Sequence, residues 1–117
     1  MTSMIRYTNQ SLLGTVESLR SLRVQGRKVA HCHGVFDLLH PGHLAHLQEA
    51  KAQGDLLVVT LTPDHLVNKG PGRPIFTESQ RAAMLSALEM PDFVAVTTSA
   101  TAVEAINLLK PDVFVKG

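Results

Sequence analysis

The chain has 117 residues, of which 44% are hydrophobic and 4% aromatic, and its formal net charge is +1. This length predicts one domain whose core consists of aliphatic side chains, as in a buried sheet covered by helices. The near-neutral charge, without clustered Lys and Arg, argues against a nucleic-acid partner, and the scarcity of aromatic residues argues against a base-stacking platform.

The cysteine content and the hydropathy pattern bear on the cellular compartment. The single cysteine, Cys32, excludes a disulfide framework within the chain and favours a reducing environment. Residues 1–6 lack the apolar core of a signal peptide, and no apolar run is long enough to span a bilayer. We therefore expect a cytoplasmic protein without a membrane partner, in which Cys32 is an inert strand residue.

Apolar spacing alternates between helical and strand-like intervals along the chain. In chain order, the predicted elements are a helix over 11–25, a strand over 29–33, a helix over 41–52, a strand over 56–61, a helix after Thr77, a strand over 93–97, a helix over 101–109 and a strand over 113–115. The Gly- and Pro-rich segment 68–74 is predicted to be a surface loop, and Thr77 with Gln80 matches a capping box. The expected shared helix faces are Leu44, Leu47 and Lys51 in the helix 41–52 and the inward-facing Val103, Ile106 and Leu109 in the helix 101–109.

This alternation predicts an α/β fold, namely a Rossmann-like open parallel sheet with helices on both faces. The chain divides into an N-terminal helical segment, 1–27, and a domain over 28–117. Ligands of such sheets bind beyond the carboxyl ends of the strands, where the strand order reverses. The junction of the first strand and the next helix, Gly34–His43, is therefore the predicted site.

The sequence His40-Pro41-Gly42-His43 stands at the start of that helix. A helix start offers unpaired N–H groups and a positive dipole end, which favour a phosphate, and Gly42 lets a ligand approach the backbone closely. His40 and His43 are three residues apart and therefore project near each other. Two imidazoles at this point can donate hydrogen bonds to developing phosphoryl charge, as nucleotidyl transfer requires.

The run Gly34-Val35-Phe36-Asp37, followed by His40-Pro41-Gly42-His43, closely resembles the signature of the cytidylyltransferase-like family of nucleotidyltransferases. The resemblance covers about 28–117 and is closest to the branch of bacterial heptose 1-phosphate adenylyltransferases and glycerol-3-phosphate cytidylyltransferases. It is extended by Lys69-Gly70, Arg73-Pro74, Gln80-Arg81, Ala87-Leu88-Glu89 and Val115-Lys116-Gly117. The chain departs from the family at His33, where members commonly carry a small or amide residue.

The resemblance implies transfer of a nucleotidyl group from ATP or CTP to a small phosphorylated acceptor, such as a sugar or polyol phosphate, with release of pyrophosphate. It also implies Mg²⁺ as a companion of the triphosphate. The residues to which it gives catalytic phosphate contacts are His40, His43 and Lys69. The residues to which it gives nucleotide-binding roles are Gly34, Val35, Phe36, Asp37, Gly42 and Arg81.

Family members usually continue beyond the position of Gly117, and some are fused to a sugar-kinase-like domain. We therefore expect this chain to be a fragment of a longer protein. Because dimerisation is common in the family, the resemblance also implies a possible homodimer. An alternative hypothesis is a non-catalytic, nucleotide-binding or regulatory module of that longer protein.

The histidines also allow a zinc hypothesis, because His40, His43 and His46 lie at steps of three along a helical edge. No carboxylate or thiolate completes a tetrahedral set, so no metal site is predicted. His46 is interpreted as a helix-surface residue and His31 as a residue packed in or beside the strand.

Three charged residues have competing interpretations. Asp37 could hold a catalytic group or cap the turn before the helix. Asp64 is expected to be an N-cap in preference to a ligand contact. Arg81 could pair with Glu78 or Glu89 instead of reaching a phosphate.

Overall fold

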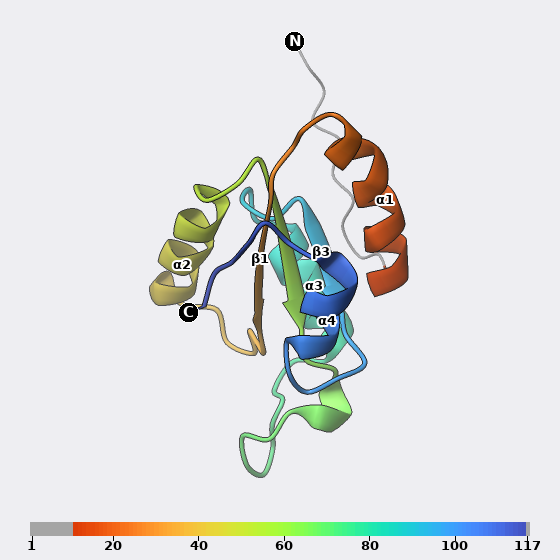
Figure 1. Cartoon of the computed structure of the whole chain (residues 1–117). Coiled ribbons are helices and arrows are strands. Elements are labelled where there is room, and N and C mark those ends of the chain that lie inside the picture. Colours follow the sequence, from red (N-terminus) through yellow and green to blue (C-terminus); the bar gives the residue numbers. More distant parts are fainter. Residues whose placement is uncertain (1–10, 117) are drawn as a thin grey trace.

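The computed structural model of the protein describes residues 11–116 and contains one four-stranded parallel sheet (Figure 1). The elements in chain order are α1 (Leu12–Val24), β1 (Val29–Gly34), α2 (Pro41–Lys51), β2 (Leu56–Leu61), the 3-10 helix η1 (Asp64–Leu66), α3 (Glu78–Ser86), β3 (Phe93–Val96), α4 (Val103–Leu109) and β4 (Val113–Phe114). The predicted order of helices and strands is confirmed. Residues 1–10 of the predicted N-terminal segment lie outside the described residues.

The strand order is β3-β2-β1-β4, so the sheet grows from β1 in two directions. On one side β1 pairs with β2 over its whole length, from Val29 opposite Leu56 to Gly34 opposite Leu61. On the other side it pairs with β4 over two residues only. The predicted open parallel sheet is confirmed, and the order reverses beside the carboxyl end of β1.

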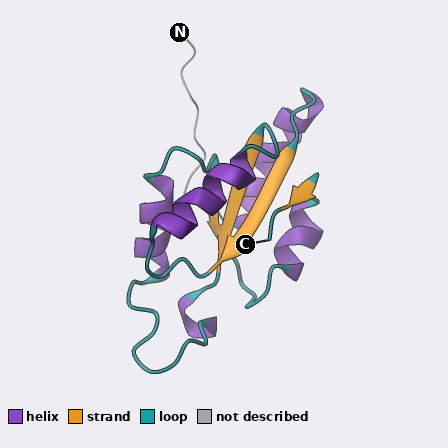
Figure 2. Ribbon diagram, turned by 90° about the vertical axis from the view of Figure 1, so that its left-hand side faces the viewer, coloured by secondary structure: helices purple, strands orange, loops and turns teal. Residues whose placement is uncertain are grey.

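Helices cover both faces of the sheet, as Figure 2 shows. The core on one face joins α2 and α3 to the sheet and contains Ala30, Cys32, Phe36, Leu47, Ala50, Leu57, Val59, Leu61, Ala82, Leu85 and Val94. The core on the other face joins α1 and α4 to the sheet and contains Leu12, Leu19, Val29, Leu56, Val58, Phe93, Ala105 and Leu109. Neighbouring strand residues alternate between the two cores because successive side chains of a strand point to opposite faces. All six residues of β2 are consequently buried.

The helices α1, α2 and α3 begin at side-chain caps, whereas α4 has none. The Ser11 hydroxyl accepts a hydrogen bond from the Gly14 N–H at the start of α1. The predicted capping box is present in α3, where Thr77 Oγ1 accepts from the Gln80 N–H and Gln80 Oε1 accepts from the Thr77 N–H. Among residues 11–116 no helix has the length and apolar character needed to cross a membrane.

Two helix faces differ from the prediction. In α2, the buried residues are Leu47 and Ala50, whereas Leu44 is 36% exposed. The face of α2 that packs on the sheet therefore includes Ala50 in place of Leu44. In α4, Ala105 and Leu109 are buried and Val103 is 61% exposed. The helix starts at Val103, later than predicted, so this side chain lies in the first turn and faces solvent.

Two leucines of α1 provide a matched test of this packing. Leu19 is 1% exposed and Leu13 is 70% exposed on the same helix. We expect Leu19→Ala to lower the free energy of unfolding by about 2–5 kcal/mol, because it removes buried methyl groups and leaves a cavity. Leu13→Ala should change it by less than about 0.5 kcal/mol. Urea unfolding followed by circular dichroism measures both values, and equal losses would contradict the placement of α1.

Candidate functional site

A cavity of about 670 Å³ opens beyond the carboxyl ends of β1 and β4. It lies at the reversal of strand order, where the sequence predicted the site. The lining from β1, the loop after it and α2 consists of His33, Gly34, Val35, Phe36, Asp37, Leu38, His40, His43 and His46. The remaining lining residues are Lys69, Arg73, Ala102, Phe114 and Lys116.

The charge of this lining is one-sided. The permanently cationic side chains are Lys69, Arg73 and Lys116, and the imidazoles of the lining histidines add hydrogen-bonding groups. The acidic lining is Asp37 alone among the described residues, and its carboxylate forms an ion pair with Arg73. A concave surface lined by one sign of charge concentrates ligands of the opposite sign, so the cavity favours anions.

His40 and His43 are held by the backbone of the helix start that they flank. His40 is the N-cap of α2, and its Nδ1 accepts a hydrogen bond from the Gly42 N–H at 3.0 Å. His43 Nδ1 accepts from the His40 N–H at 3.2 Å. A ring nitrogen that accepts an N–H carries no proton, so the proton of each neutral ring lies on Nε2. Each imidazole can therefore serve as a hydrogen-bond donor through Nε2.

The two rings pack together, which favours the neutral form of His43. Their centroids are 3.9 Å apart with a 30° tilt, and Phe36 meets the His43 ring edge-on at 5.6 Å. Burial lowers the pKa of His43, nearby His40, Lys69 and His46 lower it further, and a hydrogen bond with the Leu38 backbone opposes this shift only in part. Lys69 and His43 are thus close enough for their charges to interact.

Two predicted nucleotide-binding glycines make room for the protein's own rings. A Cβ on Gly42 would lie 2.8 Å from Cε1 of His40, and a Cβ on Gly34 would lie 2.9 Å from Cε2 of Phe36. Phe36 itself adopts a left-handed backbone, with φ of 53°, and is 5% exposed. The His40 imidazole thus lies where a Cβ of Gly42 would be, and the approach of a ligand to this backbone stays a prediction.

Asp37 does not cap the turn before the helix; it holds a segment that is distant in the sequence. Its Oδ2 accepts from Arg73 Nε at 2.6 Å and from the Ile75 N–H at 2.8 Å, and its Oδ1 accepts from the Phe76 N–H at 2.9 Å. Burial opposes its charge, but the donors of Phe76, Ile75 and Arg73 outweigh burial and lower the pKa of Asp37 to about 2. The carboxylate therefore anchors the segment 73–76.

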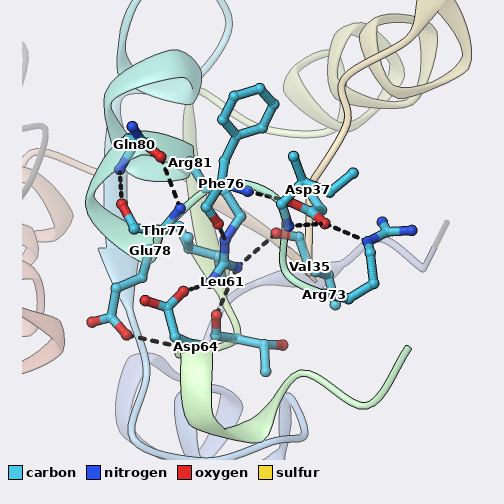
Figure 3. Close-up of polar contacts among 12 residues, drawn as sticks. Val35, Asp37, Leu61, Asp64, Arg73, Phe76, Thr77, Glu78, Gln80 and Arg81 are labelled. Carbon is cyan, nitrogen blue, oxygen red and sulfur yellow. Dashed lines mark hydrogen bonds and ion pairs between the residues drawn. The ribbon is translucent and has the colours of Figure 1, made fainter. Parts of the chain in front are cut away.

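The side chain of Arg81 is fully buried, which speaks against the predicted phosphate contact, and Figure 3 shows its polar contacts with other parts of the chain. The guanidinium donates to the carbonyl oxygens of Phe76, Val35 and Thr62. It pairs with Asp64 at 2.7 Å, and not with either predicted glutamate. Arg81 thus joins the loops that shape the cavity without reaching its surface.

Asp64 is likewise not the predicted helix cap. It is the first residue of η1, where no side-chain capping bond forms, and its carboxylate serves Arg81. Its own N–H donates to Oε1 of Glu78 at 2.9 Å. Glu78 therefore assists Arg81 indirectly, through the backbone of Asp64.

A buried chain of hydrogen bonds leads from the core to the cavity wall. Thr60 Oγ1 lies 2.8 Å from both His31 Nε2 and His33 Nδ1, and His33 Nε2 lies 3.3 Å from Thr62 Oγ1. A hydroxyl has one proton, so Thr60 can donate to only one of the two rings, and their tautomers are coupled. His31 Nδ1 is buried without a partner among the described residues, and the ring meets Phe114 edge-on.

Four basic lining residues were not predicted as site residues: His33, His46, Arg73 and Lys116. For His46 the spacing of three from His43 was the available indication, but a helix-surface role was preferred. Arg73 and Lys116 reach the cavity only through the fold, because they come from a loop and from the end of β4. Within residues 11–116 no cluster of three or more His, Cys, Asp or Glu side chains has a metal-binding arrangement.

Comparison with known proteins shows the same family that the sequence motifs resemble. The cytidylyltransferase-like family model matches residues 31–117. Bifunctional protein HldE of Helicobacter pylori strain G27 is 41% identical over 115 residues, which are 97% of this chain and 25% of that protein. The HldE protein of Syntrophotalea carbinolica is 45% identical over 107 residues, 86% of this chain and 22% of that protein. The chain thus spans about a quarter of the length of these curated relatives.

A solved structure is also similar. It is the crystal structure of the lipopolysaccharide core biosynthesis protein from Thermoplasma volcanium GSS1, with a TM-score of 0.68 and 33% sequence identity. The match covers 75% of this chain and 72% of that protein.

The buried His31 makes stability depend on pH. Burial, aided by His33, lowers its pKa from 6.5 to about 4. The unfolded chain takes up this proton below about pH 6.5, whereas the folded protein does so only near pH 4. The stability contributed by the neutral ring is therefore complete above pH 6.5 and is lost as the pH falls, by up to about 3 kcal/mol.

Urea unfolding at pH 7 and pH 4.5 tests this dependence, with His31→Gln as the matched variant. A glutamine amide can replace the Nε2 contact with Thr60 but does not titrate. We expect the variant to lose less stability than the wild type between the two pH values. Equal losses would contradict the role of His31.

Proposed function

The chain belongs to the cytidylyltransferase-like family, and from that premise we propose that it transfers a nucleotidyl group from a nucleoside triphosphate to a small phosphorylated acceptor. The observation that carries the proposal is the cationic cavity, in which two backbone-held imidazoles present Nε2 as a donor. Both substrates are phosphate anions, and the cavity has the charge to hold them.

In the proposed reaction an oxygen of the acceptor phosphate attacks the α-phosphorus in line. The bond between that phosphorus and the bridging oxygen breaks, and pyrophosphate leaves with the electron pair. Such a transfer needs alignment of the reactants and stabilisation of the charge on the phosphoryl oxygens, and no covalent intermediate with the protein.

We assign these tasks to the residues at the start of α2 and on the 68–74 loop. The Nε2–H groups of His40 and His43 donate to phosphoryl oxygens, and Lys69 adds a positive charge close to His43. Because Nδ1 of each imidazole is already bonded to the helix start, the donors need little reorganisation as the charge develops.

The proposed acceptor is a sugar phosphate, and the proposed nucleotide is ATP. The resemblance of the sequence motifs to the heptose 1-phosphate adenylyltransferase branch supports both choices. The solved relative is described as a lipopolysaccharide core biosynthesis protein, which agrees with a sugar as acceptor.

The lining residues do not form a resident Mg²⁺ site. The carboxylate of Asp37 is occupied by three donors, and the described lining contains no second carboxylate. We propose that the expected Mg²⁺ arrives as a complex with the triphosphate, bound by phosphate oxygens and water.

Substitution of His43 by asparagine separates its two roles. Asn can accept the His40 N–H in place of Nδ1, but it has no donor at the position of Nε2. We expect pyrophosphate release to fall at least about a hundredfold, as for loss of an oxyanion donor, with the thermal unfolding midpoint nearly unchanged. His65→Asn is the matched control, since His65 is exposed on η1 and lies outside the cavity lining.

The assay uses the wild type and both variants with each common nucleoside triphosphate and a panel of sugar phosphates. Near wild-type turnover by the His43 variant would overturn the proposed mechanism. Saturable nucleotide binding without pyrophosphate from any acceptor would instead support the non-catalytic module.

A further inference from the structure

Arg73 contributes a guanidinium to the cavity that no role described above uses. Its side chain is 28% exposed and lines the cavity from the 68–74 loop. Its Nε donates to Oδ2 of Asp37 at 2.6 Å. The guanidinium is therefore fixed at one of its three nitrogens.

The anchor of this contact is rigid. The side chain of Asp37 is 1% exposed, and it also accepts from the N–H groups of Ile75 and Phe76. The same carboxylate therefore holds the side chain of Arg73 and the backbone that follows it. Arg73 is consequently restrained in position more tightly than an ordinary arginine on a surface loop.

The two terminal nitrogens of Arg73 remain available. They have no partner among the described residues, and Figure 3 shows them pointing away from the Asp37 carboxylate. A planar guanidinium fork matches two oxygens of a phosphate and binds them through parallel hydrogen bonds. Restraint at Nε reduces the entropy that the side chain loses when it binds.

The position of Arg73 differs from that of the other loop cation. Lys69 is close enough to His43 to lower its pKa, whereas Arg73 forms an ion pair with Asp37. The Arg73–Asp37 pair carries no net charge. Its contribution to binding is therefore directional hydrogen bonding, in contrast to the long-range attraction of Lys69.

We propose that Arg73 binds a phosphate group of a substrate and that Asp37 is the positioning residue that aims it. This inference rests on the proposed function, in which the cavity holds a nucleoside triphosphate and an acceptor phosphate. Either substrate can supply the phosphate, and the experiment separates the two sources.

Isothermal titration calorimetry with inorganic tripolyphosphate and inorganic phosphate tests the proposal without any turnover. Tripolyphosphate represents the nucleotide, and phosphate represents the acceptor. Arg73→Gln should raise the Kd of at least one probe by about tenfold or more, as expected for loss of charge-assisted hydrogen bonds. An effect on tripolyphosphate alone or on both probes assigns Arg73 to the triphosphate, and an effect on phosphate alone assigns it to the acceptor.

Two further variants sharpen the result. Arg73→Lys keeps the positive charge, but a single ammonium group cannot pair with Asp37 and also donate two parallel hydrogen bonds to a phosphate. The Kd of the affected probe should therefore rise in this variant too. Arg20→Gln removes an exposed charge from α1, outside the cavity, and should leave both Kd values within about twofold of wild type. Unchanged Kd values for both probes in Arg73→Gln, or no binding of either probe to the wild type, would overturn the proposal.

Asp37→Asn tests the positioning role separately. It keeps the size of the side chain and removes the charge that holds Nε of Arg73. The Kd should rise as in Arg73→Gln, and the double variant should show no additional loss. A lowered unfolding midpoint with a wild-type Kd would show that Asp37 is structural only. If Arg73-dependent binding persists but no pyrophosphate is ever released, nucleotidyl transfer fails while the Arg73 site stands.

Discussion

The buried guanidinium of Arg81 is the interaction on which the shape of the cavity depends. Its partners include the carbonyls of Val35, which follows β1, and Thr62, which follows β2. One side chain thus ties together the ends of two neighbouring strands, and Asp64 balances its charge. Loss of this side chain would leave buried carbonyls unpaired, so the loops that carry the site are held in one arrangement.

Asp37 is the acidic counterpart of this clamp. The two charged residues act on the same short segment, because Phe76 donates its N–H to Asp37 and offers its carbonyl to Arg81. The loop before α3 is thereby joined to the loop after β1. The Gly- and Pro-rich loop can in this way present Arg73 at a defined place.

With the loops held, hydrogen bonding at the start of α2 decides the chemistry of the histidines. The N–H groups of Gly42 and His40 occupy Nδ1 of the two rings, which leaves the proton on Nε2. The unpaired N–H groups of a helix start, which were expected to meet a phosphate directly, here orient the imidazoles. Gly34 and Gly42, to which the resemblance gives nucleotide-binding roles, also leave room for the rings of Phe36 and His40.

The sequence by itself determined the order of the elements, the parallel sheet and the location of the site, because periodic burial and capping are local properties. It also predicted that His40 and His43 project near each other, and their rings pack together in the cavity lining. Only the tertiary structure showed that Arg81 and Asp37 are clamps and that Arg73 and Lys116 reach the cavity. Burial and pairing between distant residues decide those roles. The residue type and the neighbouring sequence do not distinguish a charge that faces a ligand from a charge that faces another loop.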